Sequence, residues 1–184
     1  RSTLFPYTTL FRSPYSVVCA RDASRAAELA AKFRQRGLDA SSTSDLEQAV
    51  RAAEILITTT SARHPIISAE WVAPGAHITA VGSDAPDKTE LASDLLPKAE
   101  PYACDHLEQC RTLGEWRAAL ENGVLLASPP PTLGDIVSGA RAGRTRDEAI
   151  TIADLTGVGI QDTVIAIHAY RNLLRDMEDG SMRQ

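Results

Sequence analysis

The fold of this chain is decided by residues 77–91, which read HITAVGSDAPDKTEL. The apolar run at residues 77–81 predicts a buried strand of a parallel sheet. Gly-Ser at positions 82–83 ends that run, and Asp84 follows at once. Ligands of open α/β sheets bind beyond the carboxyl ends of the strands. An acidic side chain at this point is therefore placed for chemistry rather than for packing.

The remaining periodic segments place this strand in an α/β fold. The predicted strands are residues 14–20, 38–40, 54–58, 77–81, 99–103 and 149–154, and the predicted helices are residues 23–36, 45–52, 113–122, 133–138 and 161–177. Alternation of strands with amphipathic helices predicts a parallel sheet. Gly37 is placed to end the first helix. Ser44, with Glu47 three residues later, predicts a capping box for the second.

Composition limits the classes of function. The chain has 184 residues, of which 43% are hydrophobic, and this is enough for one domain with a core. A net charge of −5 without a basic cluster argues against a nucleic-acid partner. No apolar run approaches the roughly 18 residues of a membrane span, and no signal peptide is present, so we expect a cytoplasmic protein. Cys19, Cys104 and Cys110 lack metal-ligand spacing, which predicts reduced thiols and no metal site.

Several segments resemble the ornithine cyclodeaminase/mu-crystallin family. The most specific is AVGSDAPDKTEL at residues 80–91. The others, in the family's order, are AEILITTTS at residues 53–61, LGE at 113–115, GR at 143–144 and DLTGVGIQD at 154–162. The family motif has Gly where this chain has Asp87, a departure that could alter the turn near the nicotinamide.

The resemblance implies an incomplete Rossmann-like, doubly wound parallel sheet. The full fold has strand order 3-2-1-4-5-6 and a Gly-rich loop after strand 1. Residues 15–20 match strand 2, so we expect the first strand, its loop and the N-terminal substrate and dimerisation domain to be missing from this chain. Residues 14–160 would then be a partial NAD(P)-binding domain. Residues 161–184 would form a C-terminal helix that returns to the missing domain and exposes an apolar stripe here. Residues 1–13, RSTLFPYTTLFRS, resemble a sequencing-adapter or assembly artefact.

The resemblance also implies a catalytic residue. Asp84 matches the acid that contacts the substrate amino group and serves in proton transfer. The alternative is a cap for the turn at Pro86. Lys88 matches a residue that approaches the cofactor, and its alternative is a solvated lysine paired with Glu90 or Asp87.

Further contacts are expected at the ends of other strands. The expected cofactor-binding residues, besides Lys88, are Arg21, Asp22, Thr60, Ser61, Ile78, Thr79, Ala80 and Leu155, and Thr156 is expected to bind substrate together with Asp84. For the run Thr58-Thr59-Thr60, which ends the strand predicted at residues 54–58, the alternative is β-propensity alone.

The residues after the first predicted strand bear on the cofactor. NAD enzymes often carry an acid near the end of strand 2, which accepts from the ribose hydroxyls. Here Ala20 is followed by Arg21, which resembles the NADP-binding members, where Arg pairs with the 2′-phosphate. Asp22 could instead reach the ribose and favour NAD. We expect NADP(H) to be preferred over NAD(H).

The implied function is that of an NAD(P)-dependent enzyme. It would act on a small amino or imino acid through an imine intermediate, as a cyclodeaminase or an amino-acid dehydrogenase. One alternative is an NADPH-dependent cyclic ketimine or imine reductase, and another is a non-catalytic, mu-crystallin-like protein that binds NADP and a ligand. We expect a homodimer only for the full-length protein, and no activity from this fragment alone.

Overall fold

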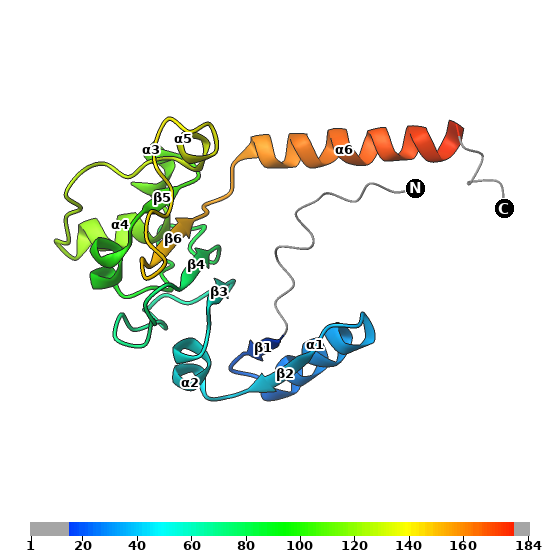
Figure 1. Cartoon of the computed structure of the whole chain (residues 1–184), viewed down its shortest axis with the longest axis horizontal. Coiled ribbons are helices and arrows are strands. Elements are labelled where there is room, and N and C mark those ends of the chain that lie inside the picture. The colour runs from blue at the N-terminus through cyan, green and yellow to red at the C-terminus, as the bar shows by residue number, and fades with distance from the viewer. Residues whose placement is uncertain (1–14, 179–184) are drawn as a thin grey trace. The chain divides into compact units, whose positions relative to one another are not determined.

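A computed structural model describes residues 15–178 of the chain (Figure 1). The chain divides into two compact units, with the boundary between Ala53 and Glu54. Both units are α/β, and every strand pairing in them is parallel. Within the described residues, every helix is too short or too polar to cross a lipid bilayer. The proposed artefact at residues 1–13 lies outside the described residues.

The first unit is a two-stranded sheet with two helices. Its elements are β1 (Ser16–Cys19), α1 (Ala23–Gln35), β2 (Ala40–Thr43) and α2 (Leu46–Arg51). The two strands pair in register from Ser16 opposite Ala40. Helix α1 buries Ala26 and Ala30, which are small enough for close packing. Gly37 has a φ of +81° and donates its N–H to the end of α1, as predicted.

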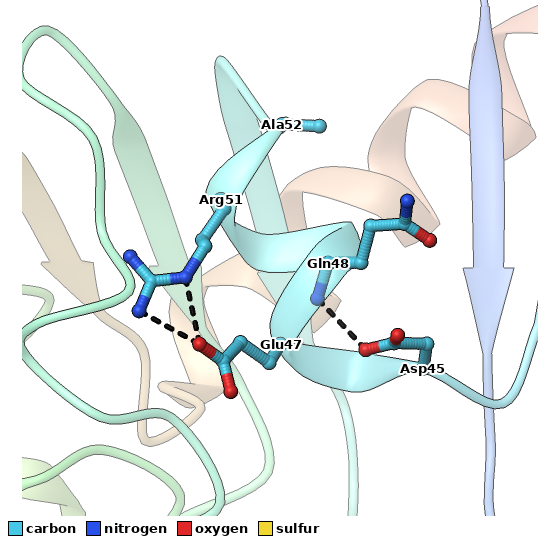
Figure 2. Close-up of a pocket in the computed structure, with 5 residues that line it drawn as sticks. All are labelled: Asp45, Glu47, Gln48, Arg51 and Ala52. Atoms are coloured by element: carbon cyan, nitrogen blue, oxygen red, sulfur yellow. Dashed lines mark hydrogen bonds and ion pairs between the residues drawn. The ribbon is translucent and has the colours of Figure 1, made fainter.

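The start of α2 corrects the sequence-based prediction of a capping box. Asp45, not Ser44, is the N-cap, and its carboxylate accepts a 2.9 Å hydrogen bond from the Gln48 N–H. Asp caps a helix as well as Ser does, so the helix begins one residue later. Glu47 turns away and pairs with Arg51 at 2.7 Å (Figure 2).

The boundary of β2 also differs from the prediction. The strand occupies Ala40–Thr43 rather than residues 38–40. The residues ASST carry little hydrophobic signal, and their pairing with β1 decides the strand instead.

The second unit contains a four-stranded sheet in the order β3-β4-β6-β5. Its strands are β3 (Ile55–Thr58), β4 (His77–Ala80), β5 (Tyr102–Cys104) and β6 (Thr151–Asp154). Its helices are the 3-10 helix η2 (Ser93–Lys98) and the α-helices α3 (Leu107–Cys110), α4 (Gly114–Glu121), α5 (Leu133–Val137) and α6 (Gly159–Glu178). The sequence predicted neither η2 nor α3, and the strand predicted at residues 99–103 begins three residues before β5.

The core of this unit lies around β4 and β6. Ile78, Ala80 and Ile152 are at most 1% exposed, and all four residues of β6 are buried. Both strands also carry polar residues, and these are hydrogen-bonded: His77 to Thr79 and Thr151, and Asp154 to Tyr102. His77 is satisfied within the sheet, because its two ring nitrogens lie 2.8 and 3.2 Å from the hydroxyls of Thr151 and Thr79.

Both sheets have outer strands within residues 15–178, and the two expected to flank the missing first strand are β1 and β3. β1 pairs with β2 alone, and β3 pairs with β4 alone. On β3, Ile55 and Ile57 are 49% and 63% exposed. The first sheet corresponds to strands 2 and 3 of the expected order, and β3 and β4 correspond to strands 4 and 5. The last strand, β6, lies between β4 and β5, so the structure is an incomplete Rossmann-like fold that departs from the expected order at this point.

Helix α6 exposes apolar side chains, as predicted. Residues at least 40% exposed on it are Ile160, Val164, Ile165, Ile167, Tyr170, Leu173 and Leu174. They lie around most of the helix rather than on one narrow stripe, so the helix has more apolar surface than an ordinary surface helix.

We expect Gly114→Ala to destabilise the protein more than Gly123→Ala. Both glycines have a φ of +74°, where a side chain costs about 1–2 kcal/mol. A Cβ on Gly114 would also lie 2.6 Å from Oδ2 of Asp154, whereas Gly123 has open space. The clash should add about 1–3 kcal/mol to the loss in the free energy of unfolding, measured by chemical denaturation. Equal losses in the two variants would contradict the close packing at Gly114.

Candidate active site

The candidate site lies at the carboxyl edge of the four-stranded sheet. Adjacent strands end in step, because the Val81 N–H donates to the Thr58 carbonyl at 2.9 Å and the Leu155 N–H donates to the Ala80 carbonyl at 2.8 Å. The loops that follow β3, β4 and β6 therefore leave the sheet from one edge, where parallel α/β folds bind their ligands.

Asp84 and Lys88 form an ion pair in the loop after β4. Lys88 Nζ lies 2.6 Å from Asp84 Oδ1, and the two side chains are 28% and 56% exposed. The hydrogen bond from Lys88 lowers the pKa of Asp84 below its usual value, so Asp84 is a carboxylate near neutral pH. Lys88 does not pair with Asp87, which contacts Arg63 at 3.0 Å instead.

Glu115 on α4 lies below this loop and is 1% exposed. Its Oε1 accepts hydrogen bonds from the Ser83 hydroxyl and from the Glu90 N–H, the latter at 2.8 Å. Its Oε2 accepts from the Thr89 hydroxyl at 2.9 Å and the Leu91 N–H at 3.1 Å. Burial raises the pKa of Glu115, and these four donors oppose that shift. One carboxylate thus contacts the loop on both sides of the Asp84–Lys88 pair.

Glu90 links the loop after β4 to the loop after β3. Its side chain is fully buried and accepts from the Thr60 N–H at 2.5 Å and the Gly82 N–H at 2.8 Å. The two loops approach so closely that a Cβ on Gly82 would lie 2.2 Å from the Thr60 carbonyl oxygen. This position needs glycine because of space alone.

Asp154, at the end of β6, anchors the start of α4. Its Oδ2 accepts from the Tyr102 hydroxyl at 2.5 Å and from the N–H groups of Glu115 and Trp116 at 2.9 and 3.3 Å. Its Oδ1 is buried without a partner among the described residues. Burial raises the pKa of Asp154 to about 7, and the hydrogen bond from Tyr102 opposes the shift.

Asp105 accepts hydrogen bonds from the loop after β6. Its Oδ2 accepts from the N–H groups of Thr156 and Gly157, both at 2.8 Å, and its Oδ1 accepts from the Thr156 hydroxyl at 2.9 Å. Gln109 donates to the Gly157 carbonyl at 2.7 Å from the other side. This loop is therefore also fixed by side chains beneath it.

Comparison with known proteins shows where this architecture occurs. Residues 16–176 match the ornithine cyclodeaminase/mu-crystallin family. The chain belongs to this family.

Three relatives illustrate the range of the ornithine cyclodeaminase/mu-crystallin family. An uncharacterised cyclodeaminase of Sinorhizobium fredii is 42% identical over 156 residues, which are 84% of this chain and 47% of that protein. An archaeal alanine dehydrogenase dimer with bound NAD superimposes with a TM-score of 0.84 at 36% identity, covering 92% of this chain and 52% of that one. Delta(1)-pyrroline-2-carboxylate reductase of Thermococcus litoralis, in complex with NADH and L-proline, gives a TM-score of 0.81 at 25% identity, covering 90% and 51%.

The chain spans about half the length of the curated relatives that it matches.

The remaining residues expected from the family resemblance differ in exposure. Thr60 and Ser61 are exposed at the sheet edge. The side chains of Ile78 and Ala80 are fully buried, whereas Thr79 is half-buried and bonded to His77. Leu155 is half-buried, and Thr156 is buried against Asp105.

Arg21 and Asp22 belong to the first unit and precede α1. Asp22 is its N-cap and accepts from the Ser24 and Arg25 N–H groups at 3.0 and 3.3 Å. Hydrogen bonds from Ser24 lower the pKa of Asp22. Arg21 is exposed. The carboxylate of Asp22 thus caps α1. Of these two residues, Arg21 is the one whose charged group can contact a ligand.

The donors at the sheet edge suit part of a dinucleotide. Thr60 and Ser61 offer exposed hydroxyls, and Lys88 offers an ammonium group, which together can bind ribose hydroxyls and phosphate oxygens. Among the described residues, no three His, Cys, Asp or Glu side chains are grouped to hold a metal ion.

Sequence analysis missed the roles of the three buried carboxylates Glu90, Glu115 and Asp154. The segments LGE and DLTGVGIQD were noted only for their family resemblance. The available signal was an acidic residue in an otherwise buried segment, which is rare unless its oxygens are satisfied.

The raised pKa of Asp154 predicts a pH dependence of stability. The folded protein keeps this proton up to about pH 7, whereas the unfolded chain releases it near the ordinary value of 3.8. The folded state therefore binds more protons between these values, and the contribution of Asp154 to the free energy of unfolding falls as pH rises from about 4 to 7.

The variant Asp154→Asn should lose that part of the slope, because an amide has the same shape and does not titrate. Chemical denaturation of both proteins at several pH values between 4.5 and 8 measures the difference. Parallel stability curves for the two proteins would show that Asp154 is ionised throughout.

Proposed function

We propose that this chain is the dinucleotide-binding part of an NAD(P)-dependent enzyme that acts on a small amino or imino acid through an imine. The observation that carries this proposal is the exposed Asp84–Lys88 pair, which lies at the carboxyl edge of a parallel sheet in a loop fixed from below. Cyclodeaminase and amino-acid dehydrogenase are the two reactions we place first.

In this proposal Asp84 is the catalytic residue and also binds the substrate. It is ionised near neutral pH, so it can pair with a substrate ammonium and accept a proton from it. Lys88 lies within hydrogen-bond distance of Asp84 and offers its charge to the cofactor. Once Lys88 binds an anion, Asp84 is freed for the substrate. Thr156 and Leu155, in the loop held by Asp105, are the proposed contacts on the neighbouring strand.

The nicotinamide would supply or take up a hydride at the carbon that bears the nitrogen. We propose Thr60, Ser61 and Lys88 as its contacts at the sheet edge. Ile78 and Ala80 support that edge from within the core, and Thr79 is half-buried, as is His77 on the same strand. Arg21 is the proposed contact for the adenosine end, with Asp22 supporting the turn before α1.

A ketimine or imine reductase is the second candidate. The match to the Thermococcus litoralis reductase in complex with NADH and L-proline supports it, at a TM-score of 0.81, as the match to the alanine dehydrogenase at 0.84 supports the first candidate. Reduction of a cyclic imine and oxidation of an amine are one reaction in opposite directions, so the same Asp84 serves both. A non-catalytic binding protein is the remaining alternative, and the exposed carboxylate is unneeded there.

We further propose a cytoplasmic location and a longer native protein. The substrate domain and the Gly-rich loop would belong to its other half, and α6 would cover its apolar residues against that half in a homodimer. This chain alone should then be inactive. Purified chain that turns over an amino acid with NAD(P) would contradict this division of labour.

We expect Asp84→Asn, in the full-length protein, to lower turnover about a hundredfold or more, which is the usual scale for a general acid–base group. Affinity for the dinucleotide should stay nearly unchanged, because the amide keeps the size of the side chain. Steady-state kinetics and cofactor titration measure the two effects.

Asp94→Asn is the matched control for this substitution. Asp94 forms an exposed i,i+4 pair with Lys98 at 3.2 Å, the same kind of pair away from the sheet edge. It should leave turnover as in the wild type. Wild-type turnover in Asp84→Asn would remove Asp84 from catalysis and the proposed function with it.

The position of Arg21 predicts that NADP(H) binds more tightly than NAD(H) in the full-length protein. An arginine paired with the 2′-phosphate is a charge-assisted contact of roughly 1.5–3 kcal/mol, or about ten- to a hundredfold in affinity. Arg21→Ala should abolish the preference, and Arg36→Ala, at the other end of α1, should preserve it. Equal affinity for both cofactors in the wild type, measured by calorimetric titration, would exclude Arg21 from the site.

A further inference from the structure

The loop after β4 is held at two places that flank its functional residues. Ser83 directly precedes Asp84, and residues 89–91 directly follow Lys88. All four of the donors on these flanks point to the two oxygens of Glu115. Residues 84–88, between these flanks, do not bond Glu115, and they include Asp84 and Lys88.

We propose that Glu115 is a positioning residue, which sets the geometry of Asp84 and Lys88 by holding both ends of their loop. This inference rests on the proposed function of Asp84. It adds that the reaction depends on a buried side chain that touches neither substrate nor cofactor.

The chemistry of the contact requires a carboxylate. Each Glu115 oxygen accepts two hydrogen bonds, and an ionised carboxylate is the side chain that offers only acceptors. An amide would turn one acceptor into a donor, which would then face two donors from the loop. Within the described part of the chain Glu115 has no ion-pair partner, so the loop itself stabilises its charge.

The first turn of α4 is a rigid base for this contact. Asp154 accepts from the N–H of Glu115 itself, so β6 fixes the backbone from which the carboxylate extends. Arg117, on the same helix, donates to the Lys88 carbonyl at 2.7 Å. Helix α4 therefore contacts the loop through two side chains, and the loop cannot shift without breaking hydrogen bonds that are buried.

The test is a double-mutant cycle in the full-length protein. Glu115→Gln should lower kcat about tenfold to a hundredfold, the cost of displacing a catalytic group by about an ångström. If Glu115 acts through Asp84, the same substitution should change kcat less than threefold in an Asp84→Asn background. A purely structural role would give the same loss in both backgrounds, and that result would overturn the proposal.

Asp135→Asn is the matched control for the chemical change. Its carboxylate also accepts a backbone N–H, from Thr132 at 2.9 Å, but it caps α5 away from the loop. It should leave kcat within twofold of the wild type. A loss of kcat in this control equal to that in Glu115→Gln would make the effect of Glu115 nonspecific and overturn the proposal.

Two milder variants serve if Glu115→Gln does not fold. Ser83→Ala and Thr89→Val each remove one of the four donors, and each should lower kcat severalfold in the wild type and much less in the Asp84→Asn background. Unchanged kcat in both would overturn the proposal.

Hydrogen exchange provides a readout that is independent of activity. In Ser83→Ala and Thr89→Val, the amides of Glu90 and Leu91 should exchange at least tenfold faster, while those in β5 should not change. Unchanged exchange at Glu90 and Leu91 would overturn the positioning role even if Asp84 is catalytic. Loss of the effect of Asp84→Asn itself would instead refute the proposed function.

Discussion

The buried charge of Glu115 is the constraint on which the candidate site depends. A carboxylate removed from water is costly unless hydrogen-bond donors replace its hydration. Here the donors come from a loop that has no regular structure of its own, at both of its ends. The loop thus stabilises the charge, and the charge fixes the loop together with the side chains of Glu90 and Arg117.

Three other acidic side chains along the sheet edge also accept hydrogen bonds from backbone N–H groups. Glu90 accepts backbone N–H groups from the loops after β3 and β4, and Asp105 accepts them from the loop after β6. Asp154 accepts them from the first turn of α4. Strand ends in parallel sheets leave their amides without partners in the ladder. In this fold the amides donate to acidic side chains, of which Glu90 and Asp154 are buried and Asp105 is half-buried.

The sequence predicted the strands of the second unit better than it predicted the buried acids of the candidate site. The strands at β3, β4 and β6 lie in short, largely apolar runs. Such a run can be recognised in the sequence without knowing which strands pair with it. The buried acids could not be found in this way, because Glu115 bonds residues 24 to 32 positions away and Asp154 bonds residues 38 to 52 positions away. The misplaced start of α2 has a different cause, since two adjacent residues, Ser44 and Asp45, are equally good caps and only the fold chooses between them.

In the loop after β4, the residues that bond Glu115 are different from the residues at the tip of the loop, 85–87. Two of the four hydrogen bonds to Glu115 come from backbone amides, which any residue except proline supplies, and two come from the hydroxyls of Ser83 and Thr89, while residues 85–87 take no part in them. Substitutions at residues 85–87 can therefore change the side chains presented to a ligand at the sheet edge without removing a hydrogen bond to Glu115. Asp87, which stands where the family motif has glycine, is such a change, and in this chain it has gained an ion pair with Arg63. A scaffold built this way can diversify in chemistry while its frame stays constant.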